Sequence, residues 1–423
     1  MNEPELFNTW SRRRMLSLTA GAVGGAMLSG SNLCSQIADG QSLLASPAKG
    51  GAPAGGLLKK RIKSRTFNVH THITGLPRSI AAAANLPKTE VKPFDAQMPI
   101  TEQDRKEAIT YWSRFKHGIL EYDSQEQEDL FVRKYIHNRR NARRITFEDQ
   151  AERFLAEMDE AGIDTAVLLE LDFMRPLAAV SEGDLKGERV EPMLAATQEL
   201  CRKYPGRFHP FAAIDVRRGK EGVRLFEKAV KQYGFKGYGE LVGTLWQTKP
   251  NNRELCYPFF EKALELGVPV MIDATMDRGF SDPIIYEDIL RDFPKLKICA
   301  GGAGIRVNPV EQNGKTISAP DRMLQLAEQH ENLWLDLDDW QVADQKGIRR
   351  YLDYLRRALN GPAKNRIMFG SDFPVFEWMY TEKEWVEFIL KQADKKEIKF
   401  SEKELALFFS LNALNYLGLK AGQ

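Results

Sequence analysis

The chain has 423 residues, which is enough for one large domain or two ordinary ones. A hydrophobic content of 43% and a charged content of 28% are typical of a soluble globular protein. The formal net charge of +2 argues against nucleic acid or an anionic membrane surface as a partner.

The amino terminus has the features of an export signal. Three arginines, Arg12 to Arg14, precede an uncharged run rich in Gly, Ala and Ser from Leu16 to Leu33, which is typical of a twin-arginine signal peptide. We expect residues 1–48 to be removed at Ser46-Pro47-Ala48 after the twin-arginine export machinery has carried the protein to the periplasm or another exported location. An N-terminal membrane anchor is the alternative, and after cleavage no stable membrane span is expected. Residues 49–66 then form a linker, which opens with Ala, Gly and Pro.

The first predicted strand covers residues 67–72, in which apolar and polar side chains alternate. On a strand, Asn68, His70 and His72 would share one side, so two imidazoles could reach one metal ion. A long insertion follows at residues 75–144, with helices expected at Glu102–His117 and Gln125–Arg143.

From Phe147 onward, short apolar strands alternate with amphipathic helices, a rhythm that indicates parallel strands buried on both faces. Eight such strands predict a (β/α)8 TIM barrel over residues 67–423, in which the insertion at 75–144 covers the mouth as a lid. An open doubly wound sheet is the alternative, although no Gly-x-Gly-x-x-Gly turn follows an early strand. The later strands are expected at residues 165–171, 208–214, 237–241, 268–272, 296–300, 333–337 and 366–369.

The carboxyl ends of these strands, which face the site in a barrel, are rich in acidic residues. After the two histidines of the first strand come Glu170 or Asp172, Asp215, Glu240, Asp273, the turn Gly301–Gly304, Asp336 or Asp338, and Asp372. Like charges this close raise one another's pKa unless they bind a cation or hydrogen-bond donors.

Several of these motifs together resemble the amidohydrolase superfamily, in particular its metal-dependent hydrolases and decarboxylases. The resemblance runs from about Phe67 to Leu417 and is carried by short motifs along that length. It implies a TIM barrel with a divalent metal at the carboxyl-terminal mouth. The motifs are His70-Thr71-His72, Met158 to Asp164, Pro205 to Phe208, Leu266 to Val270, and Gly370-Ser371-Asp372-Phe373-Pro374.

The resemblance implies that His70, His72 and Asp372 are metal ligands, with Asp372 also handling a proton. Two histidines that the family carries are absent. On the fifth strand Asp273 follows Ile272, and on the sixth the turn reads Ala300-Gly301-Gly302-Ala303-Gly304. Asp273 or Glu240 would then supply a fourth ligand. Two imidazoles and two carboxylates suit one zinc ion, with manganese or iron as alternatives.

The function predicted from this resemblance is metal-dependent hydrolysis of a small-molecule ester, lactone or amide, with Asp372 accepting a proton from water. The alternatives are nonoxidative decarboxylation of an aromatic or enolic acid, metal-independent lactone hydrolysis, and a binding protein without catalysis. In the metal-independent reaction Arg278, Arg306 and Lys315 could hold the substrate. A homo-oligomer is compatible with the sequence, which does not specify the oligomeric state.

Overall fold

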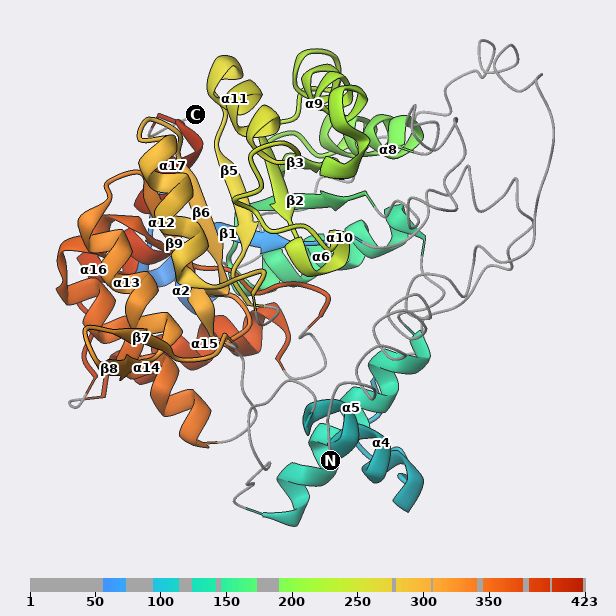
Figure 1. Cartoon of the computed structure of the whole chain (residues 1–423). Helices are drawn as coiled ribbons and strands as arrows, with labels where there is room; N and C mark the ends of the chain where they lie inside the picture. The colour runs from blue at the N-terminus through green and yellow to red at the C-terminus, as the bar shows by residue number, and fades with distance from the viewer. Residues whose placement is uncertain are drawn as a thin grey trace, which may run out of the picture.

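Parallel strands form the centre of the molecule, and their order in space follows their order in the chain. The computed structural model describes residues 56–73, 94–113, 124–141, 146–172, 190–275, 279–305, 307–340, 345–375, 380–395 and 398–420. Within these ranges lies an eight-stranded sheet in the order β1-β2-β3-β4-β5-β6-β9-β10 (Figure 1). The strands are β1 Phe67–Thr71, β2 Thr165–Leu171, β3 Phe208–Ala213, β4 Gly237–Leu241, β5 Val270–Asp273, β6 Ile298–Gly301, β9 Leu333–Asp336 and β10 Ile367–Met368.

The segment after β10 returns to β1 and closes the sheet. Val69 N donates to Phe369 O at 2.9 Å, and Asp372 N donates to His70 O at 2.9 Å. Thr71 and Phe373 form a further parallel bridge. The predicted (β/α)8 TIM barrel is therefore confirmed, and the open-sheet alternative is wrong.

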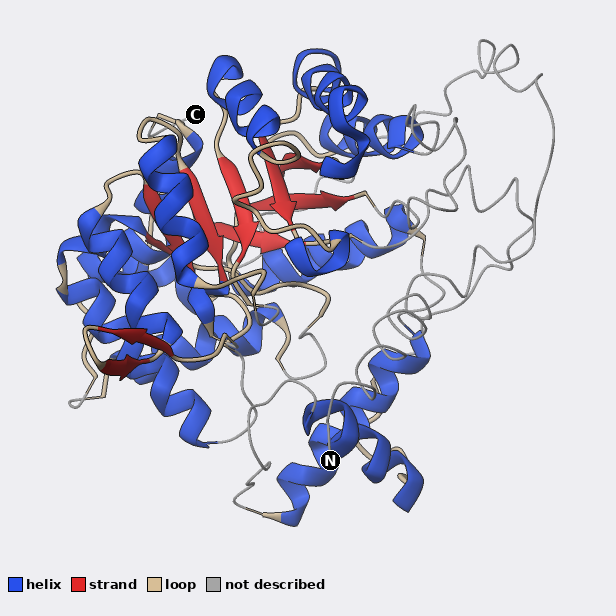
Figure 2. Ribbon diagram, viewed as in Figure 1, coloured by secondary structure: helices blue, strands red, loops and turns tan. Residues whose placement is uncertain are grey.

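Apolar side chains pack on both faces of the strands, as expected for a parallel sheet. The larger cluster lies between the strands and the helices that surround them, which Figure 2 shows in blue around the red strands. A smaller cluster fills the barrel and includes Tyr416, whose hydroxyl donates to Val270 O at 2.9 Å. Its other members include Phe67, Val69, Val167, Leu169, Phe211, Met271, Cys299, Trp334 and Met368.

The helices begin and end where local chemistry dictates. Thr146 caps the helix α6 (Phe147–Ala161) by accepting a hydrogen bond from Asp149 N, and Gly162 ends it with a φ of 81°. The final predicted helix, residues 402–417, runs through α16 (Glu402–Ala406), a π-helical turn (Leu407–Leu411) and α17 (Asn412–Leu417). The remaining barrel helices are α8 Val190–Lys203, α9 Gly219–Tyr233, α10 Gly243–Trp246, α11 Tyr257–Leu266, α12 Pro283–Asp292, α13 Ala319–Gln329, α14 Gln345–Asn360 and α15 Glu382–Ala393.

Part of the predicted linker is packed structure. Leu57–Arg61 forms the helix α2, and Leu58 and Ile62 are buried in the larger core cluster. Arg61 pairs with Glu402 of α16 at 2.7 Å. The linker predicted at 49–66 therefore does not extend through residues 57–66, because two apolar side chains there reach the core. The predicted signal peptide, residues 1–48, lies outside the described residues.

The insertion between β1 and α6 contains two helices, as predicted. They are α4 (Glu102–Ser113) and α5 (Gln125–Asn141), drawn in teal below the barrel in Figure 1. Lys134 of α5 pairs with Glu384 of α15 at 2.8 Å, which ties the insertion to the barrel. The rest of the insertion, residues 74–93, 114–123 and 142–145, lies outside the described residues, so its role as a lid stays a prediction.

The loop after β6 carries a hairpin that the sequence pattern did not predict. Its strands are β7 (Val310–Gln312) and β8 (Lys315–Ile317), which pair antiparallel. Lys315 is exposed on this hairpin.

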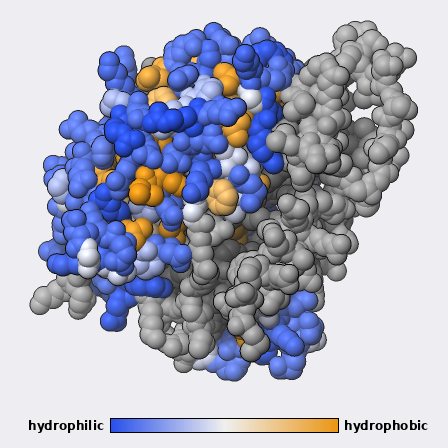
Figure 3. All heavy atoms as spheres, viewed as in Figure 1, coloured by the Kyte–Doolittle hydropathy of each residue, from blue (hydrophilic) through white to orange (hydrophobic). Residues whose placement is uncertain are grey.

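The described surface is largely hydrophilic on the face in Figure 3, with apolar residues in small patches. Exposed large hydrophobic residues sit on different elements, such as Ile109 on α4 and Ile284 on α12, which is normal for a protein surface. Among the described residues, none of the helices combines the length and apolar character needed to span a membrane. Cys201, Cys256 and Cys299 are free thiols.

Candidate metal centre

A change of register in β1 turns both histidines into the barrel mouth. Asn68 pairs with Ala166, but Thr71 pairs with Leu168, so three residues of β1 oppose two of β2. A bulge of this kind re-aims side chains. Asn68 points outward to Glu382 of α15, whereas His70 and His72 face the mouth. The expectation that all three share one side is therefore wrong.

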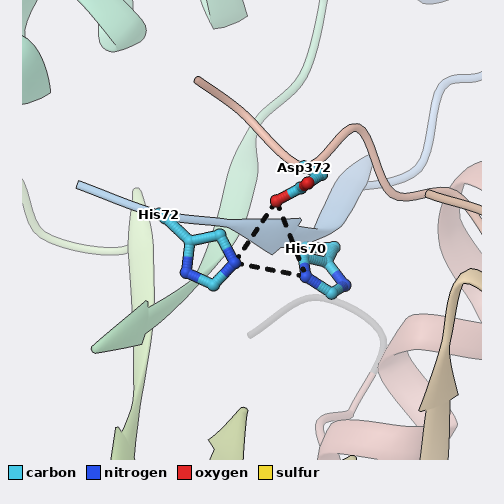
Figure 4. Close-up of side chains that lie close together, drawn as sticks. All are labelled: His70, His72 and Asp372. Carbon is cyan, nitrogen blue, oxygen red and sulfur yellow. Dashed lines mark hydrogen bonds and ion pairs between the residues drawn. The ribbon is translucent and has the colours of Figure 1, made fainter. Parts of the chain in front are cut away.

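Four donor atoms converge at this mouth. His70 Nε2 and His72 Nε2 are 3.3 Å apart, and Asp372 Oδ1 lies 3.3 Å from His72 Nε2 and 3.9 Å from His70 Nε2 (Figure 4). Glu240 Oε2 lies 3.5 Å from His70 Nε2 and 3.6 Å from His72 Nε2. All four residues are buried. Ligands about 2.0–2.1 Å from a tetrahedral ion stand about 3.3–3.4 Å from one another, so the measured spacings are close to those of one metal site.

The hydrogen bonds of the two imidazoles leave both Nε2 atoms without a proton. His72 Nδ1 lies 3.0 Å from Leu169 O, which can only accept, so Nδ1 donates. His70 Nδ1 donates in the same way to Asp336 Oδ2 at 2.6 Å. In a neutral histidine the lone pair is then on Nε2, the form that binds a metal. Two such lone pairs 3.3 Å apart repel unless a cation lies between them. The residues present therefore fit a divalent ion.

Asp336 and Asp338, which follow β9, control the charge of His70. Burial lowers the pKa of His70, but Asp338, Glu240 and Asp336 more than offset this and raise it well above its usual value. Burial raises the pKa of Asp336 and raises that of Asp338 well above the usual range, opposed in both by His70. This crowding of negative charge favours a cation at the mouth.

A buried network behind the mouth fixes the segment that carries Asp372. Asn68 Nδ2 donates to Ser371 Oγ at 2.7 Å and to Glu382 Oε2 at 3.1 Å. Asn68 Oδ1 accepts from Ser371 N and from His70 N, both at 3.2 Å. Asp372 itself has a φ of 53°, an uncommon conformation for a residue other than glycine. The network therefore holds the first strand and the closing loop in one arrangement.

Glycines allow the backbone to pass close to the ligands. A Cβ on Gly301 would lie 3.0 Å from His70 Cε1 and 3.1 Å from Glu240 Oε1. A Cβ on Gly370 would lie 2.1 Å from Asp336 Oδ1. At the end of β6, where the family carries a histidine, His70 and Glu240 thus occupy the space next to the backbone.

The other predicted site residues lie in different surroundings. The Asp273 carboxylate accepts from Thr275 N at 2.8 Å and Thr275 Oγ1 at 2.6 Å, and lies 3.4 Å from Ser281 Oγ. The measured approaches to the two imidazoles are those of Glu240 and Asp372. Arg278 and Arg306 lie outside the described residues.

Glu170, at the end of β2, is a buried acid beside the histidines. Burial raises its pKa to about 7, although Thr197, whose hydroxyl donates to it, and the charge of His72 both lower it. Asp172, two residues on, is instead held by Arg218, whose Nη2 lies 2.9 Å from Asp172 Oδ1.

Two kinds of residue were missed or given no role by sequence reasoning. Asp336 was one of several carboxylates at strand ends, and nothing in the sequence showed that it would bind His70. Glu382 was not singled out, because it lies at the start of a helix eleven residues beyond Ser371. The Thr381-x-x-Glu384 capping box marks that helix start and was the one available signal.

Fold and site together define a parallel barrel whose mouth presents two imidazoles and several carboxylates. A family model described as Amidohydrolase matches residues 111–419. The chain belongs to this amidohydrolase family.

Among characterised proteins, the gamma-resorcylate decarboxylase of Polaromonas sp. is 31% identical to this chain over 128 residues. That match covers 29% of this chain and 38% of the decarboxylase. Similar solved structures include a 5-carboxyvanillate decarboxylase from Novosphingobium aromaticivorans complexed with manganese. It is 15% identical with a TM-score of 0.49, covering 85% of this chain and 97% of the other. A probable 2-pyrone-4,6-dicarboxylic acid hydrolase from Acinetobacter baumannii is 14% identical with a TM-score of 0.47, covering 84% and 100%.

Proposed function

We propose that the protein is a metal-dependent nonoxidative decarboxylase that acts on a small aromatic or enolic carboxylic acid. The observation that carries the proposal is the convergence of four donor atoms at spacings close to those of a single ion. The local similarity to gamma-resorcylate decarboxylase favours decarboxylation over the hydrolysis that the sequence first suggested.

In this proposal His70, His72, Asp372 and Glu240 hold one divalent ion. Two nitrogen and two oxygen donors suit manganese as well as zinc or iron. When bound, the ion would orient an anionic substrate and stabilise the negative charge that develops as the bond to the carboxylate breaks.

The chain's own groups supply position and a proton. Asp336 and the Leu169 carbonyl orient the two imidazoles. In decarboxylation the bond between the ring carbon and the carboxylate breaks, carbon dioxide leaves, and a proton takes its place on the carbon. Asp372, at the meeting point of the donors, would deliver that proton. In hydrolysis the same carboxylate would instead accept a proton from water.

The test is a turnover assay with gamma-resorcylate and related hydroxybenzoates, beside a panel of esters, lactones and amides. We expect carbon dioxide release that is lost on chelation, restored by manganese or zinc, and abolished in His72→Ala and Asp372→Asn. Lys315→Ala, which changes an exposed hairpin residue, is the control and should keep full activity. Hydrolysis of the panel without decarboxylation, turnover that survives chelation, or no turnover at all would each refute the proposal.

We also propose that the protein is exported by the twin-arginine route. The support is the arginine triplet at Arg12–Arg14 ahead of an uncharged, small-residue run. Replacing Arg12, Arg13 and Arg14 together with lysine should leave the protein in the cytoplasm when cell fractions are compared by immunoblot.

A further inference from the structure

A second group of donors lies beside the candidate metal centre. The loops after β9 and β10 bring together Asp338, Asp339 and Asp372, each with one carboxylate oxygen within 4.8 Å of the others. Their exposed fractions are 2%, 1% and 8%. Asp372 belongs to this group and to the group with His70 and His72.

Asp338 presents an oxygen that has no partner in the described part of the chain. Its Oδ1 is fully buried and makes no hydrogen bond there, while its Oδ2 lies 3.5 Å from His70 Nδ1. Leaving a buried polar atom unpaired costs about 1–3 kcal/mol, and more for a charged group. The nearby indole of Trp340 does not satisfy it, because its Nε1 donates to Gly302 O at 3.0 Å.

Formal charge gives a separate argument. An ion of charge +2 held by neutral His70 and His72 is balanced by Glu240 and Asp372. Asp338 and Asp339 then add two further negative charges in the same buried region. Buried charges are normally paired or coordinate metals.

We propose that a second divalent cation binds between these loops, held by Asp338, Asp339 and Asp372, with the Asp372 carboxylate shared between two ions. Paired metal ions in enzymes lie about 3.5–4 Å apart, a separation that one carboxylate can bridge. Three oxygen donors favour a hard cation, so manganese or magnesium would bind better than zinc.

The second site goes beyond the proposed reaction, and only its use of Asp372 is common to both. It would give the mouth a second positive charge toward which an anionic substrate can orient.

The test is the number of manganese ions bound per chain. Chelator-stripped full-length protein would be loaded with manganese, freed of excess metal, and measured by elemental analysis and by electron paramagnetic resonance. We expect two ions per chain with a spin-coupled spectrum in the wild type. In Asp338→Ala we expect one ion with an uncoupled spectrum. Asp338→Asn, which keeps the side-chain size, replaces the alanine variant should that variant fail to fold by circular dichroism.

The outcomes separate this inference from the proposed function. One uncoupled ion in the wild type, lost in His72→Ala but kept in Asp338→Ala, would overturn the second site and leave the first. Two ions that persist in Asp338→Ala would also overturn it. No bound manganese in the wild type would overturn both.

Discussion

The replacement of Asp336 by asparagine tests how His70 is prepared to bind a metal. Asp338 N donates to Asp336 Oδ1 at 2.9 Å, so an asparagine at position 336 must keep its oxygen there. Its amide NH2 would then occupy the place of Oδ2, which lies 2.6 Å from His70 Nδ1. A donor facing Nδ1 forces that nitrogen to accept, which moves the ring proton to Nε2. His70 then has no lone pair for the metal.

The magnitude follows from this change of tautomer. Loss of the group that orients a metal-binding histidine typically weakens metal binding by about 10–100-fold, or about 1.4–2.7 kcal/mol. Because Asp336→Asn also loses a charge beside His70, we expect the upper half of that range.

Isothermal titration of stripped protein with manganese or zinc measures this effect. Asp215→Asn is the matched control, since Asp215 is equally buried at the end of β3 but binds Arg217 instead of a histidine. We expect the control to keep wild-type affinity. Equal metal affinity in Asp336→Asn and wild type would show that Asp336 does not set the His70 tautomer.

Three further predictions concern the surroundings of the mouth. The folded-state pKa of Glu170 is about 7 against a model value of 4.5, so the native state holds the proton longer and wild-type stability falls as the pH rises between these values. Glu170→Gln should therefore gain up to about 3 kcal/mol relative to wild type between pH 4.5 and 7, by urea denaturation of metal-free protein, and a difference independent of pH would contradict this. Gly370→Ala places a Cβ 2.1 Å from Asp336 Oδ1 and should cost about 1–3 kcal/mol of stability together with metal affinity, whereas wild-type metal binding would show that the backbone yields without cost. Asn68→Ala removes donors from the buried Glu382 carboxylate and should lower the free energy of unfolding by at least about 1–3 kcal/mol, and an unchanged urea midpoint would disprove the network's role.

The sequence by itself determined the architecture and most of the candidate donors. Alternation of short apolar strands with amphipathic helices specifies a parallel barrel, because only covered parallel strands are apolar on both faces. The barrel in turn places the ends of its strands at one mouth. His70, His72, Glu240 and Asp372 could therefore be named as neighbours before any distance was known.

Only the tertiary structure decided how these side chains meet. A bulge in β1 separates Asn68 from the two histidines, and strict alternation cannot predict where a strand gains a residue. The structure brings Glu240 next to both imidazoles, places Asp273 beside Thr275, and turns Asp336 toward His70. Each outcome depends on the register between strands far apart in the chain and on backbone turns of a few ångströms. Residue order does not encode these directly, because they are settled by the packing of the whole barrel.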